Sequence, residues 1–173
     1  MHAPAKKSLL VFLLVMLQIM WPGIVRADDD SDNCSYPSPA DRFGITVYDS
    51  DAIGNYDVSV LGAGGYLNWK ADIAAPHPSD MRYLFMVRVH EAGYRPAPAR
   101  LSVIAAANPG EIWLIGNEPD VMWQDNTSPA SYVTAYHGAY HAIKAGDPTA
   151  RVAIGGIVQA SPLRLMWLQR VWD

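Results

Sequence analysis

The sequence contains one cysteine, Cys34, so it cannot form a disulfide bond within the chain. The stability of the folded protein must therefore come from a packed apolar core rather than from covalent cross-links. Half of the residues are hydrophobic, which is ordinary for a globular protein with such a core. The Cys34 thiol can form a disulfide bond only with a thiol of another molecule.

The sequence also lacks a cluster of basic residues. Its 13 Lys and Arg residues are outnumbered by 17 Asp and Glu residues, which gives a formal net charge of −4. Nucleic-acid-binding surfaces are rich in Lys and Arg, so this composition excludes nucleic acid as an expected partner. Part of the acidic excess lies in residues 28–32, where a run of aspartates is typical of a solvated linker.

No apolar run approaches the roughly 20 residues that a membrane-spanning helix needs. The run from Leu9 to Met20 is shorter; it follows two lysines and precedes the small residues Val25 and Ala27, which is the pattern of a signal peptide. We expect export from the cytoplasm and no stable membrane association after cleavage; an uncleaved anchor is the alternative. The expected divisions are a signal peptide over 1–27, a polar linker over 28–41 and a folded domain over 42–173.

Strand and helix patterns alternate from residue 43 onward. The two later helices each begin with Ser followed by Pro, a common capping sequence. A weaker helical pattern covers residues 52–61. The expected strands are 43–48, 66–69, 83–89, 111–115 and 151–154, and the expected longer helices are 98–107, 129–145 and 163–172.

This alternation predicts a parallel sheet with right-handed crossovers. No Gly-rich phosphate-binding loop follows the first strand, so a nucleotide-binding sheet is disfavoured. We therefore predict an α/β fold of the (β/α)8 TIM-barrel type. A full barrel takes about 250 residues, whereas about 130 remain after the linker, so we expect the barrel to be truncated after about five β/α units.

Reactive side chains of such barrels lie at the carboxyl ends of the strands. The sharpest candidate is Glu118, which follows an aliphatic strand that contains Trp113. Desolvation there would raise the pKa of the Glu118 carboxyl, as suits a general acid. A general acid at this place could protonate a leaving glycosidic oxygen, and the neighbouring Asn117 could then hold a sugar hydroxyl. The other strand ends offer Asp49, Asp51, Asn68, Trp69, His90 and Glu91.

Residues 113–120, Trp-Leu-Ile-Gly-Asn-Glu-Pro-Asp, resemble the fourth-strand motif of the large clan of retaining glycoside hydrolases with (β/α)8 barrels. Residues 61–69 resemble a second-strand segment of some bacterial members. The resemblance implies that Glu118 is the acid/base, that Asn117 binds substrate, that the reaction proceeds with retention and that no cofactor or metal is needed. It also implies a nucleophilic Glu on the seventh strand, which this sequence does not supply; Asp49, Asp51 and Glu91 are candidate substitutes.

Two of the other residues, Trp69 and His90, keep two interpretations each. Trp69 either stacks on a sugar ring or belongs to the core. His90 either hydrogen-bonds to substrate or Glu118, or is an exposed loop residue. Arg88, inside an apolar strand, is expected to pair with a carboxylate. His137 and His141 are four apart, but no third ligand follows, so no metal site is predicted.

The leading hypothesis is hydrolysis of O-glycosidic bonds in a polysaccharide or glycan by an exported enzyme, with a carbohydrate substrate as its partner. The missing nucleophile makes the site of this chain incomplete, and we expect weak or no activity. The alternatives are a non-catalytic carbohydrate-binding or surface protein, and an inactive gene fragment. The sequence leaves the sugar, the linkage and the oligomeric state open.

Overall fold

The computed structural model describes residues 42–48 and 50–173. The signal peptide and linker predicted over residues 1–41 lie outside the described residues, as does Asp49. Among the described residues, no helix is both long and apolar enough to cross a bilayer.

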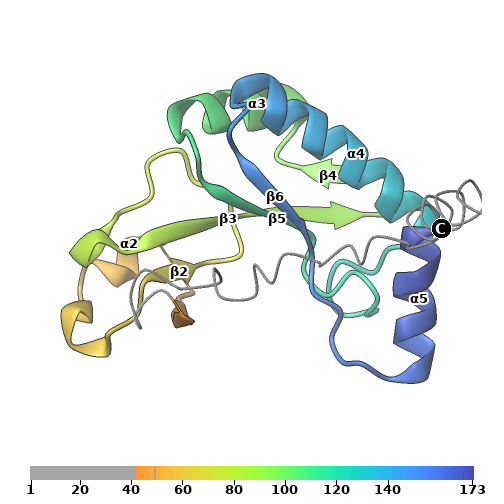
Figure 1. The fold of residues 1–173 in the computed structure, drawn as a ribbon, viewed down its shortest axis with the longest axis horizontal. Helices are drawn as coiled ribbons and strands as arrows, with labels where there is room; N and C mark the ends of the chain where they lie inside the picture. The colour runs from red at the N-terminus through yellow and green to blue at the C-terminus, as the bar shows by residue number, and fades with distance from the viewer. Residues whose placement is uncertain (1–41, 49) are drawn as a thin grey trace, which may run out of the picture. The chain divides into compact units, whose positions relative to one another are not determined.

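In the described part of the chain, one sheet is built around five parallel strands, and their order in space follows their order in the sequence (Figure 1). This order is that of successive strands in a (β/α) barrel and confirms the predicted α/β fold of barrel type. A short additional strand, β4 (Gly93–Arg95), pairs antiparallel with β3 and was not predicted. The parallel strands are β1 (Gly44–Thr46), β2 (Gly65–Leu67), β3 (Arg82–His90), β5 (Ile112–Ile115) and β6 (Arg151–Ile154).

Three longer helices follow the later strands: α3 (Pro98–Ala107), α4 (Pro129–Gly146) and α5 (Pro162–Trp172). Each begins with proline in its first turn, where a missing N–H costs no hydrogen bond. Ser128 caps α4 as predicted, because its Oγ accepts a hydrogen bond from Ser131 N at 3.3 Å. Ser161 makes no such side-chain bond at the start of α5. Figure 1 shows α3 and α4 on the same side of the central strands.

The helix predicted over 52–61 is wrong in its extent. The segment forms a four-residue helix, α2 (Ser50–Ile53), and a separate 3-10 turn, η3 (Val58–Leu61). Gly54 and Asn55 lie between them, and both are poor formers of a continuous helix. A second 3-10 turn, η4 (Pro78–Asp80), precedes β3.

The core lies between the sheet and helices α3 and α4. Tyr83, Phe85 and Val87 alternate along β3 and are fully buried, as is Trp113 on β5. Their rings contact one another: the centroids of Phe85 and Trp113 lie 4.5 Å apart, and those of Tyr83 and Phe85 lie 4.6 Å apart. The burial of each such side chain stabilises the fold by about 1.5–3 kcal/mol.

Both covering helices bury a stripe at helical spacing. On α3 the buried residues are Leu101, Ile104 and Ala105, which follow i, i+3, i+4 spacing in the sequence. On α4 the sequence repeats Tyr132, Tyr136 and Tyr140 at helical spacing, which predicts a tyrosine stripe, but most of the buried positions hold small residues, because the helix packs closely against α3 and β3. The buried residues of α4 are Tyr132, Ala135, Ala139 and Ile143.

The carboxyl ends of β5 and β6 approach each other so closely that only glycine fits at position 155. Gly155 N donates to Ile115 O at 2.7 Å, and a Cβ atom on Gly155 would lie 2.4 Å from Gly116 O. We expect Gly155→Ala to lower the free energy of unfolding by about 2 kcal/mol or more through this overlap. Gly156→Ala is the matched control, since nothing lies within 4 Å of its Cβ position. Equal urea midpoints for the two variants would contradict this packing.

Candidate active site

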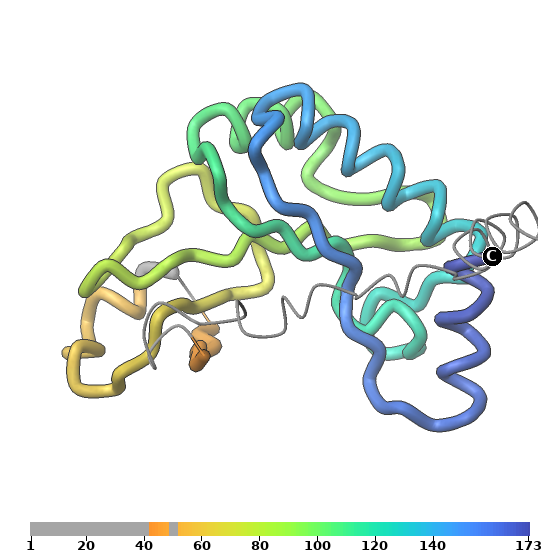
Figure 2. The backbone as a smooth tube through the Cα atoms, viewed as in Figure 1, coloured from red at the N-terminus to blue at the C-terminus, as the bar shows by residue number. Residues whose placement is uncertain are grey.

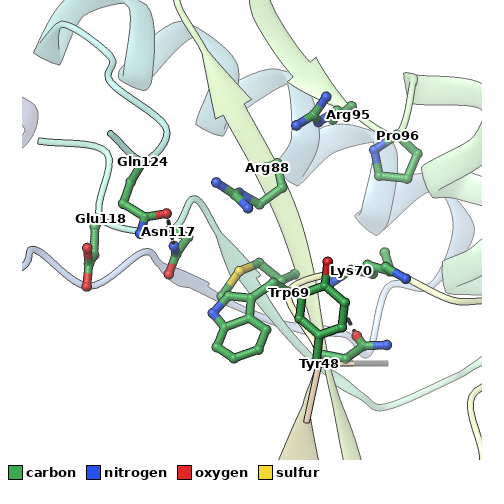
Figure 3. Close-up of a pocket in the computed structure, with 12 residues that line it drawn as sticks. Tyr48, Trp69, Lys70, Arg88, Arg95, Pro96, Asn117, Glu118 and Gln124 are labelled. Atoms are coloured by element: carbon green, nitrogen blue, oxygen red, sulfur yellow. Dashed lines mark hydrogen bonds between the residues drawn. The ribbon is translucent and has the colours of Figure 1, made fainter. Parts of the chain in front are cut away.

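An open cleft of ≈ 900 Å³ lies at the carboxyl ends of β2, β3 and β5. Four predicted site residues line it together: Asn68 and Trp69 after β2, and Asn117 and Glu118 after β5. Figure 3 shows Trp69 near Asn117, with Glu118 on the far side of Asn117. The structure therefore gathers into one cleft residues that lie about fifty positions apart in the sequence.

Glu118 has an uncommon backbone conformation. Its φ angle is +45°, in the left-handed region, which costs a residue with a Cβ atom about 1 kcal/mol or more. Its side chain is half-buried, and no described residue hydrogen-bonds to its carboxylate. A strained residue with an unoccupied carboxylate in a cleft is the arrangement expected of a group that meets a ligand.

Asn117 is fixed by two hydrogen bonds. Its backbone N–H donates to Asp125 Oδ2 at 2.7 Å, and its side-chain Nδ2 donates to Gln124 Oε1 at 3.0 Å. No described residue donates to its Oδ1 oxygen. That oxygen is therefore available to accept a hydrogen bond from a sugar hydroxyl.

Asp125 organises this end of the sheet and was missed by sequence reasoning. Its carboxylate, 1% exposed, accepts bonds from Arg88 Nε at 2.5 Å, Val89 N at 3.0 Å and Asn117 N at 2.7 Å. The predicted pairing of Arg88 with a carboxylate is thereby confirmed. No sequence pattern identifies Asp125 as the partner, because it lies in an irregular loop 37 residues from Arg88.

The loop that carries Glu118 is also tied to the last helix, α5. Asp120 Oδ2 forms an ion pair with Arg164 Nη1 at 2.7 Å, and Trp167 Nε1 donates to Thr127 O at 3.0 Å. On the other side, Tyr132 Oη donates to Ile115 O at 2.7 Å at the end of β5. Figure 2 shows this loop beside the C-terminal helix. The candidate acid is therefore held between rigid elements, as catalytic geometry requires.

Trp69 is presented by a tight turn after β2. The strand predicted to continue to Trp69 ends at Leu67, since Trp69 has a φ angle of +59°. Asn68 is buried and fully engaged: its Oδ1 accepts from Tyr83 Oη at 2.5 Å and from Lys70 N at 3.2 Å. Burial, together with the charge of Asp72, raises the pKa of the Tyr83 hydroxyl, so Tyr83 stays neutral and donates. Asn68 thus holds the turn, while Trp69 faces the cleft.

His90 and Glu91 lie outside the lining of the cleft. His90 is exposed at the end of β3, so its predicted contact with substrate or Glu118 stays a prediction. Glu91 contacts the start of α4 instead: its carboxylate accepts from Ser128 N and, at 2.6 Å, from Ser131 Oγ. It does not reach the cleft where a nucleophile would act. The side chain of Asp51, like Asp49, lies outside the described residues.

The hydrogen bond from Ser131 and that from the Ser128 backbone hold the pKa of the Glu91 carboxyl below its ordinary value of 4.5. A lowered folded-state pKa means that Glu91 stabilises the fold above pH 4.5 and loses this effect as the pH falls through the lowered value. We expect Glu91→Gln to unfold with a weaker acid dependence than the wild type. The free energy of urea unfolding, measured for both proteins on both sides of pH 4.5, tests this. An equal change of that free energy with pH in the two proteins would contradict it.

The cleft differs from the whole chain in charge. Among the described residues that line it, Glu118 is the one carboxylate, whereas Lys70, Arg88 and Arg95 are cationic.

In the part of the chain that the structure describes, no group of three or more His, Cys, Asp or Glu side chains is placed to hold a metal ion. His137 and His141 both lie exposed on α4.

The fold is similar to crystal structures of GH128 β-1,3-glucanases. A curdlan-specific exo-β-1,3-glucanase of subgroup III from Blastomyces gilchristii aligns with a TM-score of 0.61 at 20% identity, over 79% of this chain and 56% of that one. A subgroup I endo-β-1,3-glucanase from Amycolatopsis mediterranei, in complex with laminaritriose, gives 0.52 at 18% identity, over 75% and 48%. A subgroup II endo-β-1,3-glucanase from Sorangium cellulosum gives 0.51 at 19% identity, over 67% and 49%.

These likenesses establish the fold: parallel strands alternating with helices, matching part of a glycoside hydrolase barrel. The chain spans about half the length of the structures it matches. No protein-family model and no curated protein sequence matches the chain. At these identities the activity of the relatives does not transfer by similarity alone.

Proposed function

We propose that this chain carries the acid/base half of a retaining glycoside hydrolase site that cleaves O-glycosidic bonds in a polysaccharide. The observation that carries the proposal is Glu118 itself: a strained, half-buried residue whose carboxylate has no partner among the described residues, in a cleft it shares with Asn117 and Trp69. β-1,3-Glucan is the first substrate to test, because the similar structures are β-1,3-glucanases.

In a retaining reaction the protonated Glu118 donates its proton to the glycosidic oxygen while a second carboxylate bonds to the anomeric carbon and the glycosidic bond breaks. Water then displaces that carboxylate from the anomeric carbon and gives its proton to the Glu118 carboxylate, which restores the acid. Asn117 Oδ1 accepts a hydrogen bond from a sugar hydroxyl, and the Trp69 ring offers an apolar face to the sugar. Retention needs a second carboxylate about 5–5.5 Å from the first. The described lining of the cleft supplies none.

That last observation favours a second candidate function, the binding of carbohydrate without hydrolysis. All the contacts that hold Asn117 and Trp69 in place are independent of a nucleophile. A cleft with one carboxylate can therefore still bind a saccharide while turning over slowly or not at all.

The experiment that separates the two functions measures binding and release of reducing sugar on the same sample of the chain, with a β-1,3-glucan oligosaccharide. Hydrolysis above background supports the enzyme. Binding without release supports the carbohydrate-binding protein. Absence of both, with each saccharide tested, would remove the proposal that this cleft is a saccharide site.

We also propose that the protein is exported, with residues 1–27 as a cleaved signal peptide and 28–41 as a linker. The support is the charged, apolar and small-residue order of the sequence. N-terminal sequencing of the protein from a secreting host tests this. Mature chains beginning near Asp28 are expected, and chains that retain residues 9–20 would contradict it.

A further inference from the structure

Two arginines lie directly opposite each other in the hairpin of β3 and β4. Arg88 pairs in register with Arg95, so both side chains project from the same face of the antiparallel pair. Both line the cleft, and Figure 3 shows Arg88 between Arg95 on one side and Asn117 and Gln124 on the other. Like charges directly opposite each other destabilise a strand pair unless other groups compensate them.

The protein compensates only one of the two within the described residues. Arg88 Nε contacts Asp125 Oδ1, while the Nη groups of Arg88 donate to no described residue. Arg95 is exposed and has no hydrogen-bond or ion-pair partner among the described residues. The ammonium group of Lys70, which also lines the cleft, likewise has none.

The cleft is therefore cationic even when the charge of Asp125 is counted, although the chain has a formal net charge of −4. A neutral glucan offers hydroxyl oxygens to a guanidinium but no negative charge that compensates it. A carboxylate or a sulfate does, and arginine binds such groups with two parallel hydrogen bonds.

We propose that the cleft takes an acidic saccharide, whose anionic group binds Arg95 together with the free Nη groups of Arg88. This inference rests on the proposed saccharide site and narrows its substrate class to glycans that carry a carboxylate or a sulfate ester. Lys70, in the same lining, adds a further positive charge. The anionic group of the glycan compensates the positive charge of the arginine pair that Asp125 leaves uncompensated.

The test compares matched ligands by isothermal titration calorimetry with the whole chain. One ligand is laminarihexaose; the second is the same hexasaccharide with its primary hydroxyls oxidised to carboxylates; the third carries sulfate esters at those positions. We expect the wild type to bind an anionic form at least about tenfold more tightly than the neutral form, the size of a charge-assisted contact. Which anionic form binds more tightly distinguishes a uronic acid from a sulfated sugar.

Arg95→Gln should reduce this preference, measured as the ratio of anionic to neutral affinity, about fivefold or more, because Gln carries no charge. Arg95→Lys should retain part of the preference. Arg100→Gln, an exposed arginine on α3 outside the cleft, is the matched control and should behave as the wild type. Added salt should weaken the anionic ligands more than the neutral one.

The outcomes separate the two proposals. If the wild type binds the neutral ligand as tightly as the anionic ones, the preference for acidic glycans is overturned while the saccharide site stands. If the preference survives unchanged in Arg95→Gln, the assignment to the arginine pair is overturned. If none of the three ligands binds, the saccharide site and the inference both fall.

Discussion

Replacing Glu118 by Gln is expected to lower whatever kcat/KM the protein shows for an oligosaccharide by about 10²- to 10⁴-fold, the contribution of a positioned acid–base group. Gln keeps the size of the side chain but cannot donate a proton to the leaving oxygen. Because no described residue hydrogen-bonds to the Glu118 carboxylate, the change leaves the surrounding contacts intact. Binding of the oligosaccharide should therefore survive, and the loss should fall on kcat.

The leaving group gives this prediction its sharpest form. The phenolate of an aryl glycoside with an acidic phenol leaves without being protonated. Glu118→Gln should therefore slow cleavage of the aryl glycoside far less than cleavage of an oligosaccharide. Glu91→Gln is the matched control: it is the same chemical change, in a residue that contacts Ser128 and Ser131 rather than the cleft. A uniform loss with both leaving groups would indicate damage to the site instead of a lost proton donor. An unimpaired Glu118→Gln variant would remove the acid/base assignment.

Replacing Asp125 by Asn is expected to lower the free energy of unfolding by about 2–3 kcal/mol, because it leaves Arg88 next to an amide in a largely buried place. Asn can accept from the backbone of Val89 and Asn117 through its one oxygen. Its NH₂ group then faces the Arg88 guanidinium, donor against donor. The side chain of Arg88 is 25% exposed, so water relieves part of the loss and keeps the effect below that of a fully buried pair.

The same substitution should weaken saccharide binding, since the repulsion from Arg88 displaces the side chain at position 125 that positions Asn117. Asp80→Asn is the control, an exposed aspartate without a described partner, whose left-handed backbone Asn tolerates well. Urea unfolding and calorimetric titration of both variants measure the two effects. An Asp125→Asn variant as stable as Asp80→Asn would show that the buried carboxylate does not organise this end of the sheet.

The parts of the fold that the sequence predicts are those with local signals. The run from Ile112 to Ile115 is apolar enough to be a buried strand, and Ser128 followed by proline marks the start of α4 whatever its tertiary context. The alternation of such elements then restricts the topology to a parallel sheet of barrel type. The similarity to GH128 barrels agrees with that fold.

The site was only partly predictable, because its supporting contacts are between distant residues. Glu118 and Asn117 follow a strand end directly, so their place is a local property of the chain. Asp125 is held by hydrogen bonds from Arg88 and Val89 of β3. No sequence spacing predicts these long-range contacts. Strand β4 was likewise missed, as its three residues are too few for a pattern of period two.

The left-handed conformations of Trp69 and Glu118 are a second feature that sequence reasoning does not reach. Glycine, Asn and Asp are the residues usually expected there. At Trp69 the hydrogen bond from Lys70 N to Asn68 Oδ1 closes the turn. At Glu118 the bond from Val121 N to Glu118 O does so. In both places a hydrogen bond within the turn accompanies a backbone conformation that the residue type disfavours.

The most direct test of the central claim, that the cleft with Glu118 binds saccharide, is a titration of the ¹⁵N-labelled chain followed by NMR. The ligands are a β-1,3-linked hexasaccharide in its neutral and its carboxylated form. We predict that the indole N–H of Trp69 and the side-chain amide of Asn117 shift with ligand, while the indole of Trp172, 84% exposed and outside the cleft, does not. Shifts confined to Trp172, or no shift with either ligand, would contradict the claim.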